Sequence, residues 1–190
     1  MTATPPYFLT TRRLGFRTWR ASDFDLAMGL WGDPRVTRLF DRRGALSADQ
    51  VRQKLDREIA TQRNYAIQYW PIFETATGVH VGCTGLRPKD PARSILELGF
   101  HIRPDHWRKG YAGEAAQAVI DHAFRRLALA GVFAGHHPEN TVSRCLLLKL
   151  GFEHTHDEYY PPTGRKHPSY LLTAAAHRRQ RAVQTPRGLN

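Results

Sequence analysis

The sequence predicts an α+β (mixed α/β) domain. Segments of alternating apolar and polar residues, separated by turn signals, indicate antiparallel hairpins towards both ends of the chain. Between them, a strand, an amphipathic helix and a second short strand follow one another. The chain has 190 residues, which is enough for one domain with a substantial core, and no internal repeat or low-complexity linker indicates a second domain. This order of elements is typical of a sheet flanked by helices.

The N-terminal third predicts one strand and two helices. Residues 14–19 have a strand pattern, and Ser22 and Asp23 form a suitable start for a helix over 24–31. Ser47 begins a longer helix whose apolar positions are spaced for one face. These positions are Val51, Leu55 and Ile59.

A hairpin and a further strand are expected next. Residues 65–74 and 79–86 resemble two paired strands, separated by the turn signal TATG. The strand at 95–102 would direct its even positions to the core, namely Leu96, Leu98, Phe100 and Ile102. Its opposite face would then carry Glu97, Gly99 and His101, since side chains alternate along a strand.

The C-terminal half combines a long helix with a second hairpin. Apolar residues recur at helical spacing over 112–127, with polar residues on the other side. A short strand over 131–137 leads to a short helix at 143–150. The segments 152–160 and 167–173 then resemble a closing hairpin.

The charge of the chain favours an anionic partner. The formal net charge is +11, and the segment 177–190 has no Asp or Glu. Its arginines are Arg178, Arg179, Arg181 and Arg187. Such a charge fits nucleic acid, a phosphorylated cofactor or a ribosomal surface, and does not choose among them. We expect the end of the chain to be frayed and not a functional arm.

The absence of signal, membrane-spanning and metal-binding patterns leads us to expect a cytoplasmic protein without a metal site. The N-terminus has no apolar signal region, and no run of about 18 apolar residues could span a membrane. Cys83 and Cys145 lie in apparent core segments, so we expect free thiols in the reducing cytoplasm. The histidine pairs at 136–137 and 154–156 match no common metal spacing, and we expect no metal site.

Residues 106–115 read HWRKGYAGEA and open the long helix. The first N–H groups of a helix have no internal partners and favour an anion, to which Arg108 and Lys109 would add charge. Small side chains would let a ligand approach the backbone at Gly110, Ala112 and Gly113. A Walker loop and a dinucleotide fingerprint are both absent. Two interpretations remain, a cradle for a pyrophosphate and a plain turn before a surface helix.

A second segment, ENTVSRCLLLKLGF, follows at 139–152. Asn140 and Ser143 lie at a helix start, where either side chain could cap the helix. Gly151 would end that helix before a strand. The two segments in this order are more specific than either one alone.

Together, these segments resemble the GNAT superfamily of acyl-CoA-dependent N-acetyltransferases, in the RimJ/RimL-like subgroup of ribosomal-protein N-terminal acetyltransferases. The likeness also includes LGFRTWRASDFD at 14–25 and spans residues 10–175, which leaves a basic tail at 176–190. The usual signature Gln/Arg-x-x-Gly-x-Gly/Ala corresponds here to Trp107, Gly110 and Ala112. A Trp at the first place is frequent in this subgroup.

The resemblance implies a mostly antiparallel twisted sheet whose central strands splay apart to hold acetyl-CoA. The backbone of Phe100, His101 and Ile102 would pair with the pantetheine arm, and Asn140 would bind the same arm. The pyrophosphate would lie on the helix-start loop. The loop residues are Arg108, Lys109, Gly110, Tyr111, Ala112 and Gly113.

The catalytic residues of the family are carried over only in part. Many members use a Tyr four residues before the Gly-Phe pair as acid, and Leu147 stands there. Some keep an acidic residue as base on the fifth strand, where this chain has Gly135. The resemblance to RimL-like proteins indicates Ser143 as the replacement proton donor. Glu97 is the remaining carboxylate on the ligand-facing side and would act as base through water.

We therefore expect an acetyl-CoA-dependent enzyme that acetylates a primary amine by direct attack in a ternary complex. Tyr111 and His101 are weaker candidates for the base. The acceptor would be a peptide N-terminus, such as that of a ribosomal protein, or a small amine, and the enzyme a cytoplasmic monomer or homodimer. A missing strong base favours an α-amine, because deprotonation near pH 7.4 costs about 0.5 kcal/mol for an α-amine and about 4 kcal/mol for a lysine. The alternative is a basic RNA- or ribosome-binding protein with a degenerate transferase site.

Overall fold

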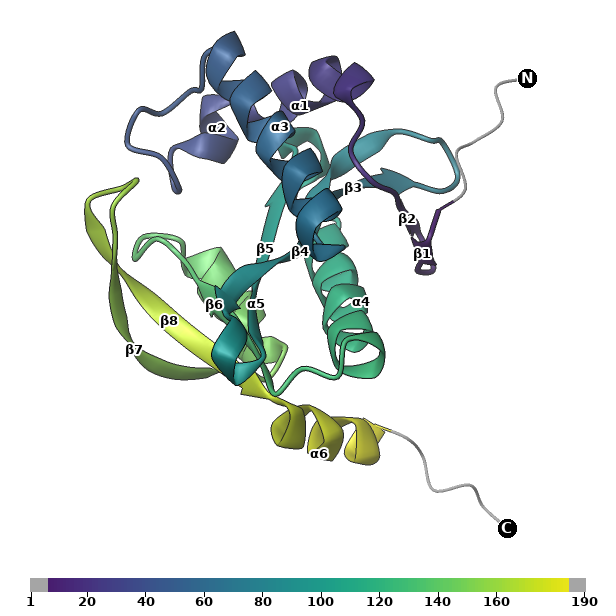
Figure 1. Cartoon of the computed structure of the whole chain (residues 1–190), viewed down its shortest axis with the longest axis vertical. Coiled ribbons are helices and arrows are strands. Elements are labelled where there is room, and N and C mark those ends of the chain that lie inside the picture. The colour runs from purple at the N-terminus through teal and green to yellow at the C-terminus, as the bar shows by residue number, and fades with distance from the viewer. Residues whose placement is uncertain (1–6, 185–190) are drawn as a thin grey trace.

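Residues 7–184, which the computed structural model describes, form a single eight-stranded sheet with helices packed against it (Figure 1). The strand order is β1-β2-β3-β4-β5-β6-β8-β7. All neighbours are antiparallel except β5 and β6, which are parallel. The predicted α+β fold with a mostly antiparallel sheet is confirmed.

The strands are β1 (Leu9–Thr10), β2 (Leu14–Phe16), β3 (Tyr69–Glu74), β4 (His80–Asp90), β5 (Ile95–Ile102), β6 (Gly131–Gly135), β7 (Glu153–Tyr160) and β8 (Arg165–Thr173). The α-helices are α1 (Phe24–Trp31), α2 (Pro34–Thr37), α3 (Ala48–Tyr65), α4 (Tyr111–Arg126), α5 (Thr141–Lys149) and α6 (Ala174–Gln184). Both predicted hairpins are present, as β3–β4 and β7–β8. The strand–helix–strand unit is β5–α4–β6.

The two long helices begin as the sequence indicates. Ser47 caps α3 by accepting the N–H of Gln50, whose side chain in turn accepts the N–H of Ser47. Val51 and Leu55 on one face of α3 are fully buried. At the start of α4, Gly110 has φ +78°, a left-handed conformation that glycine adopts without steric cost.

The core lies on both faces of the sheet. One cluster joins β-strand side chains to the apolar face of α4, and the other joins them to α1 and α3. Tyr69 and Trp70 are neighbours on β3 and belong to different clusters, as alternation requires. On β5, Leu98 and Ile102 pack with α4, whereas His101 contacts Trp31 of α1. The odd positions of β5 therefore face the side that α1 and α3 cover.

The central strands β5 and β6 pair over only three positions. Their register runs from Ile95 opposite Gly131 to Glu97 opposite Phe133. Beyond Glu97, β5 continues to Ile102 with β4 as its only strand partner among residues 7–184. The two strands thus diverge, and the start of α4 follows directly beyond the open end of β5.

The expectation of a frayed basic end is wrong for its first part. Ala174–Gln184 form helix α6, which packs against α4. The His177 ring stacks on Phe124 at 4.6 Å between centroids, and its Nε2 lies 2.9 Å from the Asp121 carboxylate. These contacts explain why an arginine-rich segment is ordered. Arg187 and the rest of 185–190 lie outside the described residues.

Candidate functional site

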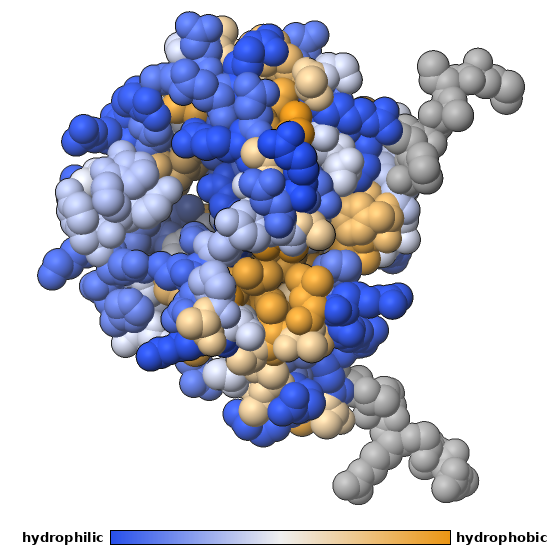
Figure 2. All heavy atoms as spheres, viewed as in Figure 1, coloured by the Kyte–Doolittle hydropathy of each residue, from blue (hydrophilic) through white to orange (hydrophobic). Residues whose placement is uncertain are grey.

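A cleft of about 1240 Å³ opens where β5 and β6 diverge. Its walls come from α3, β4, β5, β6, the starts of α4 and α5, and the β7–β8 hairpin. The face shown in Figure 2 is mostly hydrophilic and is hollowed between that hairpin and the body of the molecule. The hairpin tip is held to the other wall by the N–H of Arg42, which donates to the carbonyl of Pro162 at 3.0 Å.

The loop before α4 supplies unpaired backbone donors to this cleft. Two of its residues, Arg108 and Gly110, have positive φ values of 60° and 78°. No side chain caps α4, so the N–H groups of its first turn are available to a ligand. A Cβ at Gly113 would meet only the Leu146 side chain, at 3.4 Å. The positive φ values, the free N–H groups and the small side chains therefore favour the interpretation of this loop as an anion-binding site over that of a plain surface turn.

Two side chains hold this loop in place. The indole Nε1 of Trp107 donates to the carbonyl of Ile102 at 2.7 Å and fixes the loop to the end of β5. Arg13 donates to the carbonyl of Lys109 at 2.9 Å, pairs with Glu114 at 2.6 Å and lies over the Tyr111 ring. The donor groups are therefore preorganised. Neither bracing role was expected from the sequence.

The predicted cofactor residues share this cleft with one exception. The lining includes Phe100, His101, Ile102, Arg108, Gly110, Tyr111, Ala112, Gly113 and Asn140. The Lys109 side chain does not line it, although the Lys109 carbonyl anchors Arg13. The Tyr111 hydroxyl donates to the Glu74 carboxylate, which raises the pKa of Tyr111. Because that hydroxyl is already bound and its pKa is raised, Tyr111 is a poor base.

At the start of α5, Asn140 and not Ser143 is the cap. The Asn140 side-chain oxygen accepts the N–H of Ser143 at 3.1 Å. The Ser143 hydroxyl makes no hydrogen bond to any residue in 7–184, and the residue lines the cleft at 9% exposure. Leu147, one turn later, is 1% exposed and belongs to the core. Ser143 thus brings a hydroxyl without a hydrogen bond to the cleft wall, and Thr141, at the exposed start of the same helix, also lines the cleft.

Glu97 lies on the opposite wall, at the point where β5 and β6 separate. Burial raises the pKa of its carboxyl, and the charges of Lys89 and Arg87 partly oppose this effect. Both cations have closer partners, because Lys89 pairs with Glu158 at 2.6 Å and Arg87 pairs with Glu58. Within the described part of the chain, Glu97 itself makes no hydrogen bond or ion pair. Its carboxylate is therefore free to receive a proton.

His101 is not available as a base. The Trp31 indole donates to its Nδ1 at 3.1 Å, and the Phe40 ring stacks on it with centroids 4.5 Å apart. Burial lowers the pKa of His101 well below its usual range, so the ring is neutral. Since Nδ1 accepts a hydrogen bond, the proton of the neutral ring is on Nε2. The expectation that this side chain could serve as a base is not supported, although its backbone still lines the cleft.

Tyr69 and Lys54 line the cleft and were not among the predicted site residues. A Cβ at Gly99 would lie 2.2 Å from the Tyr69 ring, so only glycine lets this ring cover β5 between Glu97 and His101. Lys54 is 8% exposed and lies on the buried face of α3. A lysine among the apolar positions of an amphipathic helix is the signal that could have drawn attention to it.

No metal site accompanies this cleft in the described residues. Within 7–184, no group of three or more His, Cys, Asp and Glu side chains is placed to hold an ion. None of the helices over the same residues combines the length and apolar character that a membrane crossing needs.

The chain matches the model of the acetyltransferase (GNAT) domain family over residues 13–153. It is 32% identical over 149 residues to an uncharacterized N-acetyltransferase, p20, of Bacillus licheniformis, with 76% of this chain and 82% of the relative covered.

Solved structures share the fold at lower identity. The spermidine N-acetyltransferase of Vibrio cholerae, solved with CoA and spermine, superposes with a TM-score of 0.74 at 17% identity, covering 88% of this chain and 99% of that one. RimL, a ribosomal L7/L12 alpha-N-protein acetyltransferase solved with CoA, has a TM-score of 0.73 at 15% identity, with 86% and 95% covered. At such identities the likeness concerns the fold alone.

Proposed function

Because this chain belongs to the GNAT family of acetyltransferases, we propose that it moves the acetyl group of acetyl-CoA to a primary amine by direct attack in a ternary complex. The observation that carries the proposal is the divergence of β5 and β6 next to an uncapped helix start. One cleft thereby offers an unpaired strand edge, a set of free N–H donors and a free carboxylate.

The residues present fit acetyl-CoA. The first turn of α4, from Tyr111 to Gly113, would hold the pyrophosphate, with Arg108 adding positive charge at the cleft wall and Lys109 adding it from outside the lining. The free edge of β5 over 100–102 would pair with the amides of the pantetheine arm. Asn140 would use its side-chain NH₂ for the same arm, because its oxygen already caps α5. Bound acetyl-CoA supplies an activated thioester to the amine.

Two side chains would move protons in this proposal. Attack of the amine nitrogen on the acetyl carbon forms the new C–N bond and breaks the C–S bond. Glu97 would take a proton from the amine through a water molecule, since its carboxylate is free. Ser143 would give its hydroxyl proton to the departing sulfur, which leaves as the CoA thiol, and would take up a proton from solvent. Leu147, buried in the core, has no group that could do so.

The acceptor would be a peptide N-terminus, including that of a ribosomal protein, or a small amine. A free carboxylate with water access is a modest base, which suits an α-amine better than a lysine. The RimJ/RimL-like assignment is supported by the Trp107 signature. A binding protein with a degenerate site is the weaker alternative, because the cleft keeps free donors and a free carboxylate.

The direct test is a thiol-release assay with acetyl-CoA and a panel of free amino acids, polyamines and N-terminal peptides. We expect CoA release to depend on the amine, with the acetylated product found by mass spectrometry. A sequential kinetic pattern, with no acetylated enzyme after incubation with acetyl-CoA alone, is expected for direct attack. Absence of transfer to every amine in the panel would overturn the proposal and favour the RNA- or ribosome-binding alternative.

A further inference from the structure

A buried lysine lines the cleft at the wall that α3 supplies. Lys54 extends from the face of α3 that packs on the sheet, in line with Val51, Leu55 and Glu58. It is 8% exposed, yet it lines the cleft. Its Nζ lies 4.9 Å from the centroid of the Trp31 ring and 5.2 Å from that of the Phe40 ring. The ammonium group is therefore held against aromatic faces at the wall of the cleft.

The charge of Lys54 is not balanced by the residues around it. Within 7–184, its Nζ makes no hydrogen bond and no ion pair. The carboxylates nearby are committed elsewhere. Glu58 accepts from Arg87 and from the N–H of Tyr69, and Asp41 is bound by Arg43. A buried charge without a partner is costly, so this position is stabilised by any anion that enters the cleft.

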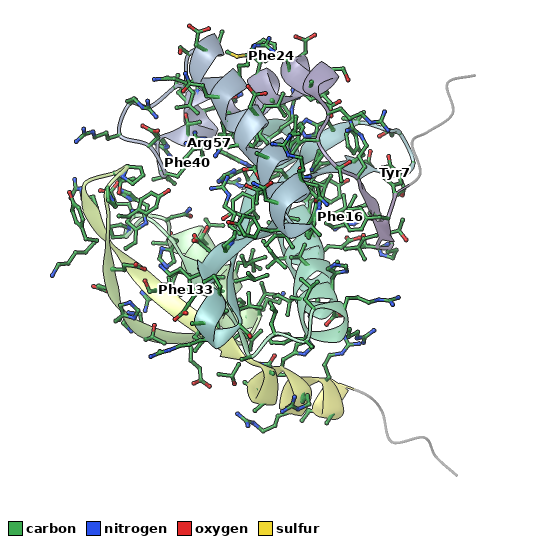
Figure 3. The ribbon with its side chains drawn as sticks, in the orientation of Figure 1. Tyr7, Phe16, Phe24, Phe40, Arg57 and Phe133 are labelled. Carbon is green, nitrogen blue, oxygen red and sulfur yellow. The ribbon has the colours of Figure 1, made fainter. Side chains whose placement is uncertain are left out.

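The ammonium group lies by the face of β5 that α1 and α3 cover. Its aromatic neighbour Phe40 stacks on His101, which belongs to the same face of β5 as Glu97. In Figure 3, Phe40 lies beside the N-terminal helices and Phe133 lies on the far side of the opening, on β6; both residues line the cleft. A molecule between these walls would meet aromatic faces, the free Glu97 carboxylate and Lys54.

We propose that the acceptor amine carries a carboxylate, and that this carboxylate binds Lys54. The inference rests on the proposed function, because it names the acceptor class of the same site. One ammonium matches one negative charge, and the free Glu97 carboxylate on the same face suits the amino group of the same molecule. Two sources share this chemistry, a free amino acid and a peptide whose N-terminal residue is Asp or Glu.

The pKa of Lys54 is consistent with a site that binds a carboxylate. Burial, together with the nearby charge of Arg87, lowers the pKa of Lys54 to about 8. A bound carboxylate would raise the pKa again, since an opposite charge favours the ammonium form. A cationic acceptor such as a polyamine would meet the opposite condition and would be repelled by Lys54.

The test compares acceptors that differ in one charge. The peptide pair is Asp-Ala-Ala-amide and Asn-Ala-Ala-amide, and the amino-acid pair is alanine and alaninamide. For each acceptor, kcat/KM is measured with the parent protein and with Lys54→Met. For each acceptor, the ratio of kcat/KM in the parent to kcat/KM in Lys54→Met does not depend on the intrinsic reactivity of the amine. We expect Lys54→Met to lower kcat/KM about 10- to 100-fold for the charged member of one pair and little for the neutral member. The affected pair identifies the source.

Three variants make this comparison specific. Lys54→Arg keeps the charge and should retain part of the preference. Lys166→Met removes an exposed lysine outside the cleft lining and should leave all ratios unchanged. Thermal unfolding of Lys54→Met checks folding, and its Tm should equal or exceed that of the parent, because an unpaired buried charge is removed.

A binding experiment separates the two proposals. Calorimetry measures how tightly four compounds bind to the protein saturated with CoA. They are N-acetyl-Asp-Ala-Ala-amide, its Asn counterpart, N-acetylalanine and N-acetylalaninamide. Binding of a charged compound that Lys54→Met weakens supports the anion site even if no amine is acetylated, in which case only the proposed function fails. Preferred acetylation of neutral amines or spermidine overturns this inference alone. Equal binding and equal turnover by the parent and Lys54→Met would also overturn it.

Discussion

Asn140 caps helix α5 and Ser143 faces the cleft, and the sequence alone could not assign these two roles. A polar residue at a helix start can cap the helix or face a ligand, and both residues are suited to either role. The structure gives the cap to Asn140 and leaves the Ser143 hydroxyl without a hydrogen bond among the described residues. The two positions can therefore be tested independently.

We predict that Ser143→Ala lowers kcat by about 10²-fold, because typical losses of a positioned proton donor begin at that size. Binding of acetyl-CoA and the free energy of unfolding should change little, since alanine keeps the N–H that Asn140 accepts. Asn140→Ala is the matched control and should instead lose about 1 kcal/mol of stability with its cap. Steady-state kinetics and urea unfolding measure both effects. Turnover of Ser143→Ala equal to that of the parent would show that the hydroxyl is dispensable.

The role of Glu97 can be tested through the pH profile. Burial raises the pKa of this carboxyl, so the parent should lose kcat towards acid as Glu97 takes up a proton. Glu97→Gln cannot accept a proton and should lose about 10²-fold or more near pH 6 to 7. Near pH 9 the loss should be smaller, because acceptor amines are already neutral there. The kcat values are compared across pH 6 to 9, and parallel profiles would remove Glu97 from proton transfer.

At the scale of elements, the sequence predicted most of the fold, because amphipathic periodicity and turn signals are local. Ser47 and the apolar face of α3 show this well. The missed elements have different causes. The two-residue strand β1 pairs with β2, the next strand along the chain, and is too short to show an alternating pattern. Helix α6 depends on distant contacts, because it is ordered through His177 and its partners on α4. For the same reason, the sequence indicated the cofactor loop but not Lys54, which requires knowledge of what α3 packs against.

The helix-start loop can be tested with a pair of glycines that share a backbone conformation. Gly110 has φ +78° in the loop, and Gly78 has φ +71° in the β3–β4 turn, with open space around it. A glutamate at either position should cost about 1–2 kcal/mol of backbone strain. Only Gly110→Glu adds a side chain and a negative charge at the proposed pyrophosphate site.

We therefore expect acetyl-CoA to raise the Tm of the parent and of Gly78→Glu by similar amounts. The shift should disappear in Gly110→Glu. Differential scanning fluorimetry with increasing acetyl-CoA measures it. An undiminished shift in Gly110→Glu would mean that the pyrophosphate binds elsewhere.

At the scale of the whole molecule, packing against the sheet buries histidines on several of its strands. Burial, reinforced by Arg103, lowers the pKa of His80 to about 3. Burial lowers the pKa of His167 to about 4, and that of His101 falls well below its usual value. These rings are neutral in the folded protein at every pH near neutrality. In the unfolded chain they take up protons near pH 6.5.

The sign of the resulting pH dependence is fixed by linkage. Because the unfolded state binds more protons, the stabilising contribution of these histidines is complete above about pH 6.5 and is lost as pH falls towards 4. Each histidine contributes a slope of about 1.4 kcal/mol per pH unit within that window. Glu97 opposes this trend at the acidic end, since its raised pKa lets the folded state bind a proton first. Carboxylates with lowered pKa values, such as Glu114, act only at lower pH.

We predict that the free energy of unfolding falls steeply between pH 6.5 and pH 5, as measured by urea denaturation. His80→Leu should reduce this slope by about one proton and should be at least as stable as the parent at pH 5. Neither ring nitrogen of His80 makes a well-formed hydrogen bond among the described residues, and only the backbone of Gly82 is near enough to favour the protonated ring, so leucine removes a desolvated polar group and loses little hydrogen bonding. The exposed residue His156, replaced by leucine in the same way, should leave the slope unchanged. Equal slopes for His80→Leu and the parent would mean that His80 is protonated in the folded protein, where the Asp23 carboxylate is the negative charge that favours its protonated form.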